Sequence, residues 1–472
     1  MKVLYAVSEA RPFIASGGLA DVAGSLPQDL RKRLIGCRVV MPMYDGIPQK
    51  YKEQMEFITS IVVPVAWRRQ YCGIFRMNLG GVIYYFLDNQ YYFKRDGLYG
   101  YYDDAERFAF FARAVLEIIP HIGWKPDIIH CNDWQTALTP VYYSAMYANA
   151  PGYENIKTVF TIHNIQYQGQ YGKNLIADVV GLDEADSRLL EYDDCVNLMK
   201  GAIECANKVT TVSPTYAKEI LDPWFSHGLD GILRAREWKL QGILNGISSD
   251  YYNPETDEEI YAKFSADKIE GKAICKEKLQ YDLGLPQRPN VPLLGIVSRM
   301  VSHKGFDLVK AVVDELLATT DIQLVVLGSG DWQYEEFFKG LCSRFPEKVA
   351  LRLGFDAALA KKIYAGSDMF LMPSKSEPCG LSQMIALKYG SVPIVRETGG
   401  LRDTVFDSGA GEGNGFCFTN YNAHEMLHAI RRAVEGYADS EGWAILRRRA
   451  MLCDNSWKNA ANEYIKMYKS IL

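Results

Sequence analysis

The chain has 472 residues, a formal net charge of -5 at pH 7, 48% hydrophobic residues and 23% charged residues. These values are typical of a globular protein with apolar material for two sizeable cores, and the lack of a basic surplus argues against nucleic acid as a general partner. No apolar run approaches the roughly 20 residues needed to cross a membrane, and the first residues lack the pattern of a secretory signal peptide. The ten cysteines are scattered without a Cys-x-x-Cys pair. We therefore expect free thiols and a cytoplasmic protein with no membrane partner.

Short apolar runs alternate with helix-like segments through the first 245 residues. The predicted strands are residues 2–7, 38–41, 81–87, 127–131, 158–162 and 208–212, and the first long helix is predicted over 19–34. Continuous runs of Val, Ile and Leu, without polar alternation, are typical of strands that are covered on both faces in a parallel sheet.

The pattern pauses at the turn signals Asn245-Gly246 and Asn253-Pro254, and a charged stretch follows to residue 288. It resumes with predicted strands at 293–298, 322–327, 349–353, 369–372 and 392–395, and the chain ends in predicted helices at 423–437, 442–452 and 457–470. We therefore expect two doubly wound α/β domains, with ligands at the carboxyl ends of their strands and a cleft between the domains.

Small and charged residues follow several of these strands. Ser16-Gly17-Gly18 lies between the first strand and the first helix, where glycines allow close approach of a ligand and helix amides attract phosphate, although a simple turn is the alternative. The spacing matches neither Gly-x-Gly-x-x-Gly nor a P-loop, which argues against nicotinamide binding and ATPase activity.

In the second half, Arg299 and Lys304 follow the strand at 293–298, and Glu377 follows the strand at 369–372. Two cations beside a helix start could hold a pyrophosphate and stabilise its charge as it leaves, while Glu377 could accept hydrogen bonds from a sugar. The alternatives are a solvated pair of surface cations and a carboxylate that only favours a helix N-terminus.

In the first half, Asp133 and His163 also follow predicted strands, and their spacing with Glu377 does not match a metal site. The segment 89–104 is rich in tyrosine and includes Tyr92, Arg95 and Tyr99. Aromatic rings pack against the apolar faces of sugars, so this segment is a candidate for acceptor binding. Stacking on nucleic acid bases and a loop anchored by its tyrosines are the alternatives.

Taken in this order, the segments resemble the bacterial glycogen synthase and plant starch synthase family over essentially the whole chain. The matching segments are residues 8–9, 17–22, 131–134, 160–169, 245–247, 298–305, 377–382 and 398–405. The resemblance implies a GT-B fold with an N-terminal Rossmann-like domain (1–245, joined by the C-terminal helix 457–472) and a nucleotide-sugar-binding domain (246–456). It implies a retaining glycosyltransferase that adds glucose from a nucleotide sugar to the non-reducing end of an α-1,4-glucan, with ADP-glucose favoured as the donor and UDP-glucose possible.

The resemblance also implies a set of site residues and neither a metal nor another cofactor. Catalytic roles fall on Asp133, His163, Arg299, Lys304 and Glu377; nucleotide-sugar contacts fall on Ser16, Gly17, Gly18, Asn245, Phe355, Cys379, Gly380, Leu381 and Ser382; and acceptor contacts fall on Tyr92, Arg95 and Tyr99.

Three positions depart from the family pattern. Ala15 stands where the family has a lysine, and Phe355 stands where it often has a tyrosine, which leaves the choice between ADP-glucose and UDP-glucose open. Ile385 replaces the second acid of the Glu-x7-Glu pattern, which favours the glycogen synthase group over sucrose synthase-like enzymes. The remaining alternatives are another glycosyltransferase of the same fold, a glucan phosphorylase, and an inactive glucan-binding protein.

Overall fold

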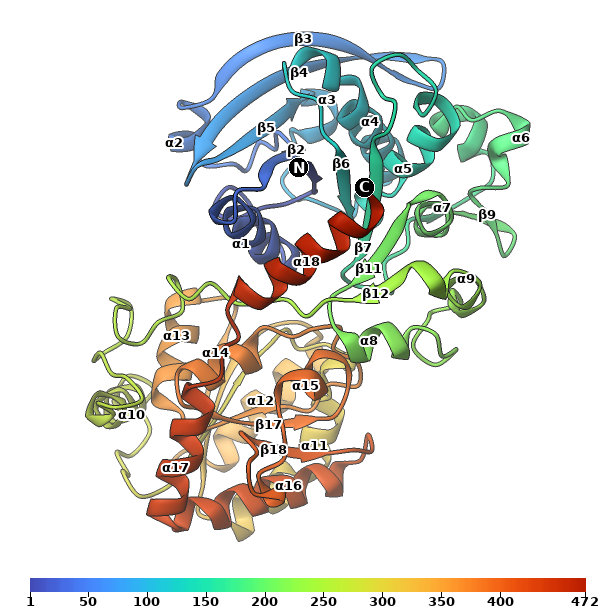
Figure 1. The fold of residues 1–472 in the computed structure, drawn as a ribbon. Coiled ribbons are helices and arrows are strands. Elements are labelled where there is room, and N and C mark those ends of the chain that lie inside the picture. Colours follow the sequence, from blue (N-terminus) through green and yellow to red (C-terminus); the bar gives the residue numbers. More distant parts are fainter. The chain divides into compact units, whose positions relative to one another are not determined.

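The computed structural model describes residues 1–472, apart from the side chain of Ala410. The chain forms two compact units (Figure 1): unit 1 comprises Met1–Asn245 and Trp457–Leu472, and unit 2 comprises Gly246–Ser456. In the part of the chain described, no helix combines the length and the apolar character that a membrane crossing requires.

Unit 1 is built on a nine-stranded sheet with the order β12-β11-β7-β6-β1-β2-β5-β4-β3. Its strands are β1 (Lys2–Ala6), β2 (Gly36–Pro42), β3 (Glu56–Val65), β4 (Arg68–Leu79), β5 (Val82–Asp88), β6 (Ile128–Asn132), β7 (Lys157–Ile162), β11 (Lys208–Thr211) and β12 (Leu240–Gly242). The β3–β4 and β4–β5 pairs are antiparallel and all other pairs are parallel. The parallel strands follow the order of a Rossmann fold, which changes direction between β1 and β6.

The centre of this sheet is fully enclosed. Val3, Leu4, Tyr5 and Ala6 of β1 are each 0% exposed. Because successive side chains of a strand point to opposite faces, both faces of the sheet are covered at β1. The longer helices of unit 1 are α1 (Gly18–Lys32), α4 (Asp104–Glu117), α7 (Leu198–Cys205) and α18 (Trp457–Ile471), and the shorter ones include α3 (Gln90–Phe93), α5 (Leu138–Tyr142), α8 (Pro214–Glu219) and α9 (Asp230–Ala235).

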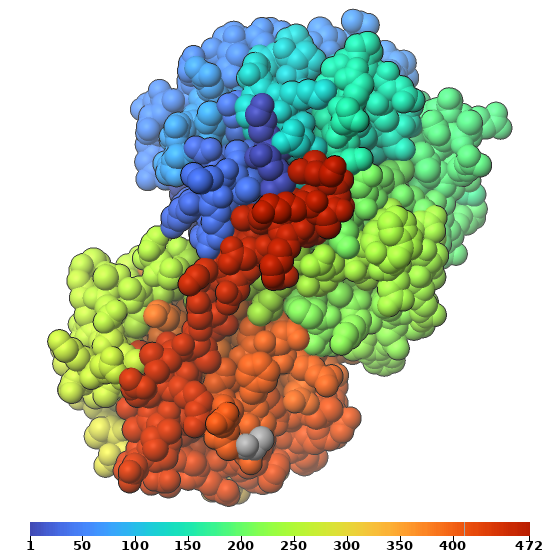
Figure 2. All heavy atoms as spheres, viewed as in Figure 1, coloured from blue at the N-terminus to red at the C-terminus, as the bar shows by residue number. Residues whose placement is uncertain are grey.

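The C-terminal helix α18 belongs to unit 1, and Figure 2 shows it lying against the N-terminal segment. Its buried face includes Trp457, Tyr464 and Tyr468, and burial of one large apolar side chain contributes about 2 kcal/mol. The Tyr468 hydroxyl lies 2.6 Å from Nδ1 of His130 on β6. Burial lowers the pKa of His130 to about 3, so this contact is made with a neutral imidazole.

Unit 2 contains a six-stranded parallel sheet with the order β15-β14-β13-β16-β17-β18. The strands are β13 (Leu293–Val297), β14 (Gln323–Gly328), β15 (Val349–Leu353), β16 (Met369–Met372), β17 (Val392–Arg396) and β18 (Phe416–Phe418). The helices are α10 (Glu270–Asp282), α11 (Phe306–Thr319), α12 (Trp332–Arg344), α13 (Ala357–Gly366), α14 (Ser382–Lys388), α15 (Gly399–Thr404), α16 (Ala423–Ala438) and α17 (Ser440–Met451). This is again the Rossmann order, and its change of direction lies between β13 and β16.

Candidate active site

In unit 1, polar residues gather at the carboxyl ends of the neighbouring strands β6 and β7. Asp133 directly follows β6, and its Oδ1 accepts hydrogen bonds from the amides of His163 at 2.7 Å and Asn164 at 3.4 Å. The backbone of Asp133 has a φ of 55°, a left-handed conformation that is uncommon outside glycine and is often found at functional sites. The Asp133 side chain, which was expected in the site, therefore joins the segment after β6 to the segment after β7.

Burial leaves this edge of unit 1 with little formal charge. Desolvation raises the pKa of Asp133 to about 7, and the nearby Glu9 carboxylate acts in the same direction. Desolvation lowers the pKa of His163 to about 3, so its imidazole is neutral near neutral pH. The Nε2 of His163 lies 2.9 Å from Oδ1 of Asn132, which also accepts from the Tyr5 hydroxyl at 2.9 Å. With its proton on Nε2, His163 presents Nδ1 as an acceptor, which suits a hydroxyl-bearing ligand.

The loop between β1 and α1 is held by a buried acid. The Glu9 carboxylate accepts hydrogen bonds from the amides of Ser16 and Gly17 and, at 3.0 Å, from the Ser16 hydroxyl. Burial raises the pKa of Glu9. Ser16, Gly17 and Gly18 are exposed, and no side chain caps the start of α1. The buried Glu9 carboxylate thus fixes the loop from its inner side, while Ser16, Gly17 and Gly18 remain exposed to solvent.

In unit 2, Lys304 and Glu377 form a close ion pair at the point where the strand order changes direction. Lys304 Nζ lies 2.9 Å from Oε1 and 2.7 Å from Oε2 of Glu377, and the Ser374 hydroxyl donates to Oε2 at 2.9 Å. Lys304 follows β13 and Glu377 follows β16, so the pair joins the ends of the two central strands. Both side chains are mostly buried.

Three glycines allow the backbone around this pair to pack closely. A Cβ on Gly305, whose φ is 80°, would lie 2.1 Å from the Pro373 carbonyl oxygen, and one on Gly399 would lie 2.0 Å from the Glu377 carbonyl oxygen. The amide of Gly400 donates to that same carbonyl at 3.1 Å. Glycine is required at such approaches, because any side chain would push the loops of Lys304 and Glu377 apart.

The other expected residues of unit 2 lie around this centre. Arg299 is exposed, and its guanidinium has neither a hydrogen bond nor an ion pair with any described residue. Phe355 is 83% exposed just after β15. Cys379 is buried and its carbonyl accepts from Gln383 Nε2 at 3.0 Å, whereas Gly380 and Leu381 lie partly exposed before α14. Phe355 and Arg299 are therefore free to meet a ligand, and Cys379 contributes mainly backbone.

Asn245 ends the first segment of unit 1 and is buried. Its Oδ1 has no hydrogen-bond partner among the described residues, which is uncommon for a buried polar atom. An unpaired acceptor of this kind fits the ligand contact expected for Asn245. Across the residues described, no group of three or more His, Cys, Asp or Glu side chains could hold a metal ion.

The tyrosine-rich segment differs from expectation. Tyr92 is fully buried, with its hydroxyl 2.5 Å from Glu106 Oε1, so its ring has no free face for a sugar and the expected acceptor role does not fit. Tyr99 is half-buried and its hydroxyl lies 2.7 Å from Ser8 Oγ. Arg95 pairs with Asp103 Oδ2 at 2.8 Å. Tyr99 therefore anchors the segment to the residues after β1, and Arg95 forms an ion pair within the segment.

Three residues of the site carried no expected role. Glu9, Asn132 and Ser374 respectively hold the Ser16 loop, the His163 ring and the Glu377 carboxylate. Each lies within or next to a segment that matches the family pattern. Their position near a strand end was the only feature of the sequence that could have indicated a role in the site. The Asn132–His163 contact joins residues 31 positions apart, whereas Glu9 and Ser374 contact residues 7 and 3 positions away.

Comparisons with known proteins agree over both units. The family model described as starch synthase catalytic domain matches residues 2–235, and the one described as glycosyl transferases group 1 matches residues 282–448. The chain is 50% identical over 476 residues to the glycogen synthase of Geobacillus thermodenitrificans (strain NG80-2), covering 100% of this chain and 98% of that protein. The glycogen synthase of Desulforamulus reducens is also 50% identical over 476 residues, with 100% and 99% covered.

A solved structure shows the same architecture. The catalytic domain of starch synthase IV from Arabidopsis thaliana, bound to ADP and acarbose, is 35% identical and matches with a TM-score of 0.93, covering 100% of this chain and 99% of that chain. Sucrose-phosphate synthase from Thermosynechococcus elongatus, at 18% identity and a TM-score of 0.61 over 100% and 99% of the two chains, shares the fold. The chain therefore belongs to the glycogen synthase and starch synthase family, and it is a glycosyltransferase with the two Rossmann-like domains of the GT-B fold.

Proposed function

We propose that this enzyme transfers glucose from ADP-glucose to the non-reducing end of an α-1,4-glucan with retention of configuration. The names of its relatives support glycogen synthesis, and the bound ADP of Arabidopsis starch synthase IV supports an adenine nucleotide. The observation that carries the proposal is the Lys304–Glu377 pair, 2.7 Å apart, beside the unpaired Arg299. It combines cations for a diphosphate with a fixed carboxylate for sugar hydroxyls.

The residues of unit 2 bind and activate the donor. Arg299 and Lys304 neutralise the diphosphate as negative charge develops on the leaving group, which lowers the barrier to departure. Glu377 retains free lone pairs after it accepts from Lys304 and Ser374, and these accept from the glucose 3- and 4-hydroxyls. The amides of Gly380 and Leu381, with Ser382, add polar contacts to phosphate or sugar, and the exposed ring of Phe355 packs against the base.

The residues of unit 1 handle the sugar and the reacting end of the acceptor. Asp133 and the Nδ1 of His163 accept from glucose hydroxyls, and the peptide carbonyl of His163 assists the anomeric carbon. The neutral imidazole does not act as a cationic acid near pH 7, because its pKa is about 3. The departing phosphate oxygen takes the acceptor proton while the acceptor attacks the same face. This route needs no enzyme nucleophile, and the paired carboxylates of a glycosidase are not required.

The test is the initial rate of glucose transfer to glycogen, measured side by side with ADP-glucose and UDP-glucose. We expect a clear preference for ADP-glucose, and release of the added glucose by an α-specific glucoamylase. Preference for UDP-glucose would overturn the donor choice and point to Ala15 and Phe355 as marks of a changed nucleotide pocket. No transfer from either donor would reject the function in favour of an inactive glucan-binding protein.

The Glu377→Ala variant tests the site itself. We expect turnover to fall by orders of magnitude while the circular dichroism spectrum is unchanged, because the carboxylate is lost from the donor site and the fold is not. Near-normal turnover would remove Glu377 from the reaction.

A further inference from the structure

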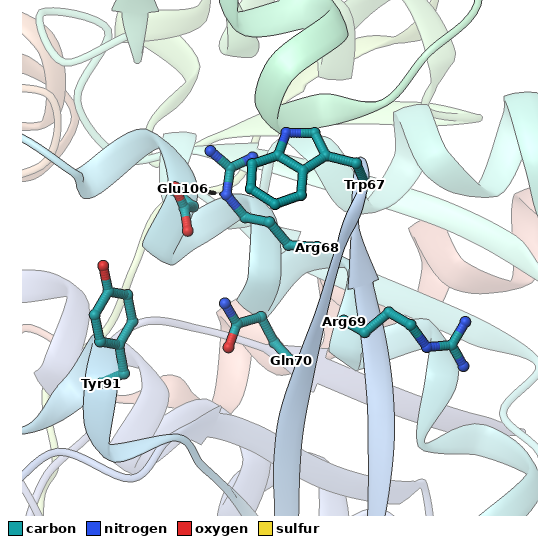
Figure 3. A pocket seen from close by; sticks show the side chains of 6 residues that line it. All are labelled: Trp67, Arg68, Arg69, Gln70, Tyr91 and Glu106. Atoms are coloured by element: carbon teal, nitrogen blue, oxygen red, sulfur yellow. Dashed lines mark ion pairs between the residues drawn. The ribbon is translucent and has the colours of Figure 1, made fainter.

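Unit 1 has a pocket that none of the expected site residues lines. It has a volume of about 560 Å³ and lies between the tip of the β3–β4 hairpin, Tyr91 of the short helix α3, and the first turn of α4. Figure 3 shows its lining residues, Trp67, Arg68, Arg69, Gln70, Tyr91 and Glu106. Two of them, Trp67 and Tyr91, are aromatic residues that are 73% and 63% exposed.

Trp67 is presented rigidly despite its exposure. Its Nε1 donates to Asp178 Oδ1 at 2.9 Å, and the Arg68 guanidinium lies 4.3 Å from the ring centroid. The hairpin tip also packs closely on Gly181, where a Cβ would lie 2.8 Å from Ala66 Cα. A large aromatic ring fixed at its edge and by a neighbouring cation loses little entropy when a ligand packs against it.

Arg68 and Glu106, two of the polar lining residues, form an ion pair with each other. Arg68 forms ion pairs with Glu106 at 3.4 Å and with Asp178 at 3.2 Å, so its positive charge is balanced. In Figure 3, Gln70 points between Tyr91 and Trp67, whereas Arg69 extends away from the other residues. Such a surface offers donors and acceptors but no excess charge, which fits an uncharged polyhydroxyl ligand better than a phosphate.

The pocket lies on the edge of the sheet that carries the active-site residues of unit 1. The pairing of β4 with β5 ends at Gly73 and Asp88, so residues 67–70 extend beyond the carboxyl end of β5. In the strand order β4 is four positions from β6, which ends beside Asp133. At the usual spacing of neighbouring strands, this separation is roughly 20 Å.

We infer that this pocket is a second glucan-binding site, in which Trp67 and Tyr91 pack against sugar rings of the acceptor polymer at a distance from its reacting end. Aromatic rings that face an opening lined by paired polar groups suit the apolar faces and hydroxyls of glucose units. The inference rests on the proposed function, which supplies a polymer long enough to occupy two sites. Holding the chain at a second site raises the local concentration of its ends near Asp133.

The first experiment measures binding without any donor. The wild-type enzyme and the Trp67→Ala and Tyr91→Ala variants are run in native gels that contain glycogen, and retardation gives the dissociation constant. We expect each variant to bind glycogen about tenfold more weakly. Trp238→Ala removes a ring of unit 1 that is 75% exposed and lies outside the pocket, so this matched control should bind like wild type.

The second experiment separates this pocket from the reacting site. With ADP-glucose as donor, KM for glycogen should rise in the Trp67→Ala and Tyr91→Ala variants while kcat and KM for maltotriose stay unchanged, and Trp67→Phe should restore most of the loss. Unchanged glycogen affinity in both alanine variants would overturn the inference, and so would an equal loss with maltotriose. If no donor supports transfer, the proposed function fails while the binding experiment still decides this site.

Discussion

Removal of the Lys304 ammonium should destabilise unit 2 as well as impair the reaction. In Lys304→Met, the Glu377 carboxylate keeps the Ser374 hydroxyl but loses both bonds to Nζ, at 2.9 and 2.7 Å. Truncation of one partner of a buried pair costs about 3–5 kcal/mol, because the other charge stays desolvated. Since the Lys304 side chain is 18% exposed, we expect about 2–3 kcal/mol in the free energy of unfolding of unit 2.

Differential scanning calorimetry would measure this as a fall in Tm of roughly 4–12 °C, at about 2–4 °C per kcal/mol for a unit of this size. The double variant Lys304→Met/Glu377→Gln should recover part of the loss, because it leaves no unpaired buried charge. Arg288→Met is the control, since Arg288 and Asp321 form an exposed pair in unit 2 that should contribute at most about 1 kcal/mol. Equal effects of Lys304→Met and Arg288→Met, or strict additivity in the double variant, would refute the buried-pair reasoning.

Two further predictions concern packing and pH. Gly399→Ala should lower both Tm and turnover, because its Cβ would lie 2.0 Å from the Glu377 carbonyl oxygen. The control is Gly231→Ala, whose Cβ would have no atom within 4 Å and which should change neither. Equal Tm values for the two variants would contradict this prediction. Between pH 6.5 and 5.5, His163 should lower the stability of unit 1 by about 1 kcal/mol as the pH falls, because the unfolded imidazole gains a proton that the folded one, with a pKa of about 3, does not. Asp133, whose pKa is raised to about 7, acts in the opposite direction. We would measure the free energy of unfolding by urea denaturation at pH 6.5 and at pH 5.5. The loss of stability between these pH values should be about 1 kcal/mol smaller in His163→Gln than in wild type, and an equal loss in both proteins would disprove the role of His163.

The sequence predicted the central strands well because of how parallel sheets are buried. The runs at 293–298 and 322–327 correspond to β13 and β14, whose side chains are enclosed on both faces and hence continuously apolar. The hairpin of β3 and β4 was not predicted. β3 is an edge strand that is mostly exposed or half-buried, so its composition lacks the continuous apolar run that marks a central strand.

Some residues of the site could be predicted from the local sequence pattern, and others could not. Asp133 and Glu377 could be placed at strand ends, because a change from apolar run to polar residue marks where a strand stops. The role of Tyr92 could not be predicted from its segment. Arg107 is fully buried and donates to the carbonyls of Tyr92 at 2.7 Å and Leu98 at 3.1 Å, which folds the segment back onto α4. The outcome depends on a residue 15 positions away, so aromatic composition alone suggested an exposure that Tyr91 and Tyr102 have and Tyr92 does not.

The two units share one strand order but differ in charge at the same edge of their sheets. In unit 1, the pKa of Asp133 is raised to about 7 and that of His163 is lowered to about 3, so both groups bear little charge near pH 6. In unit 2, Lys304 is balanced by Glu377, while Arg299 has no ion pair among the residues described, so its positive charge is available to a ligand. An uncharged edge favours a sugar and a positive edge favours a diphosphate. The same topology therefore carries a different charge at the corresponding edge of each unit, and the difference arises from burial in unit 1 and from an exposed guanidinium in unit 2.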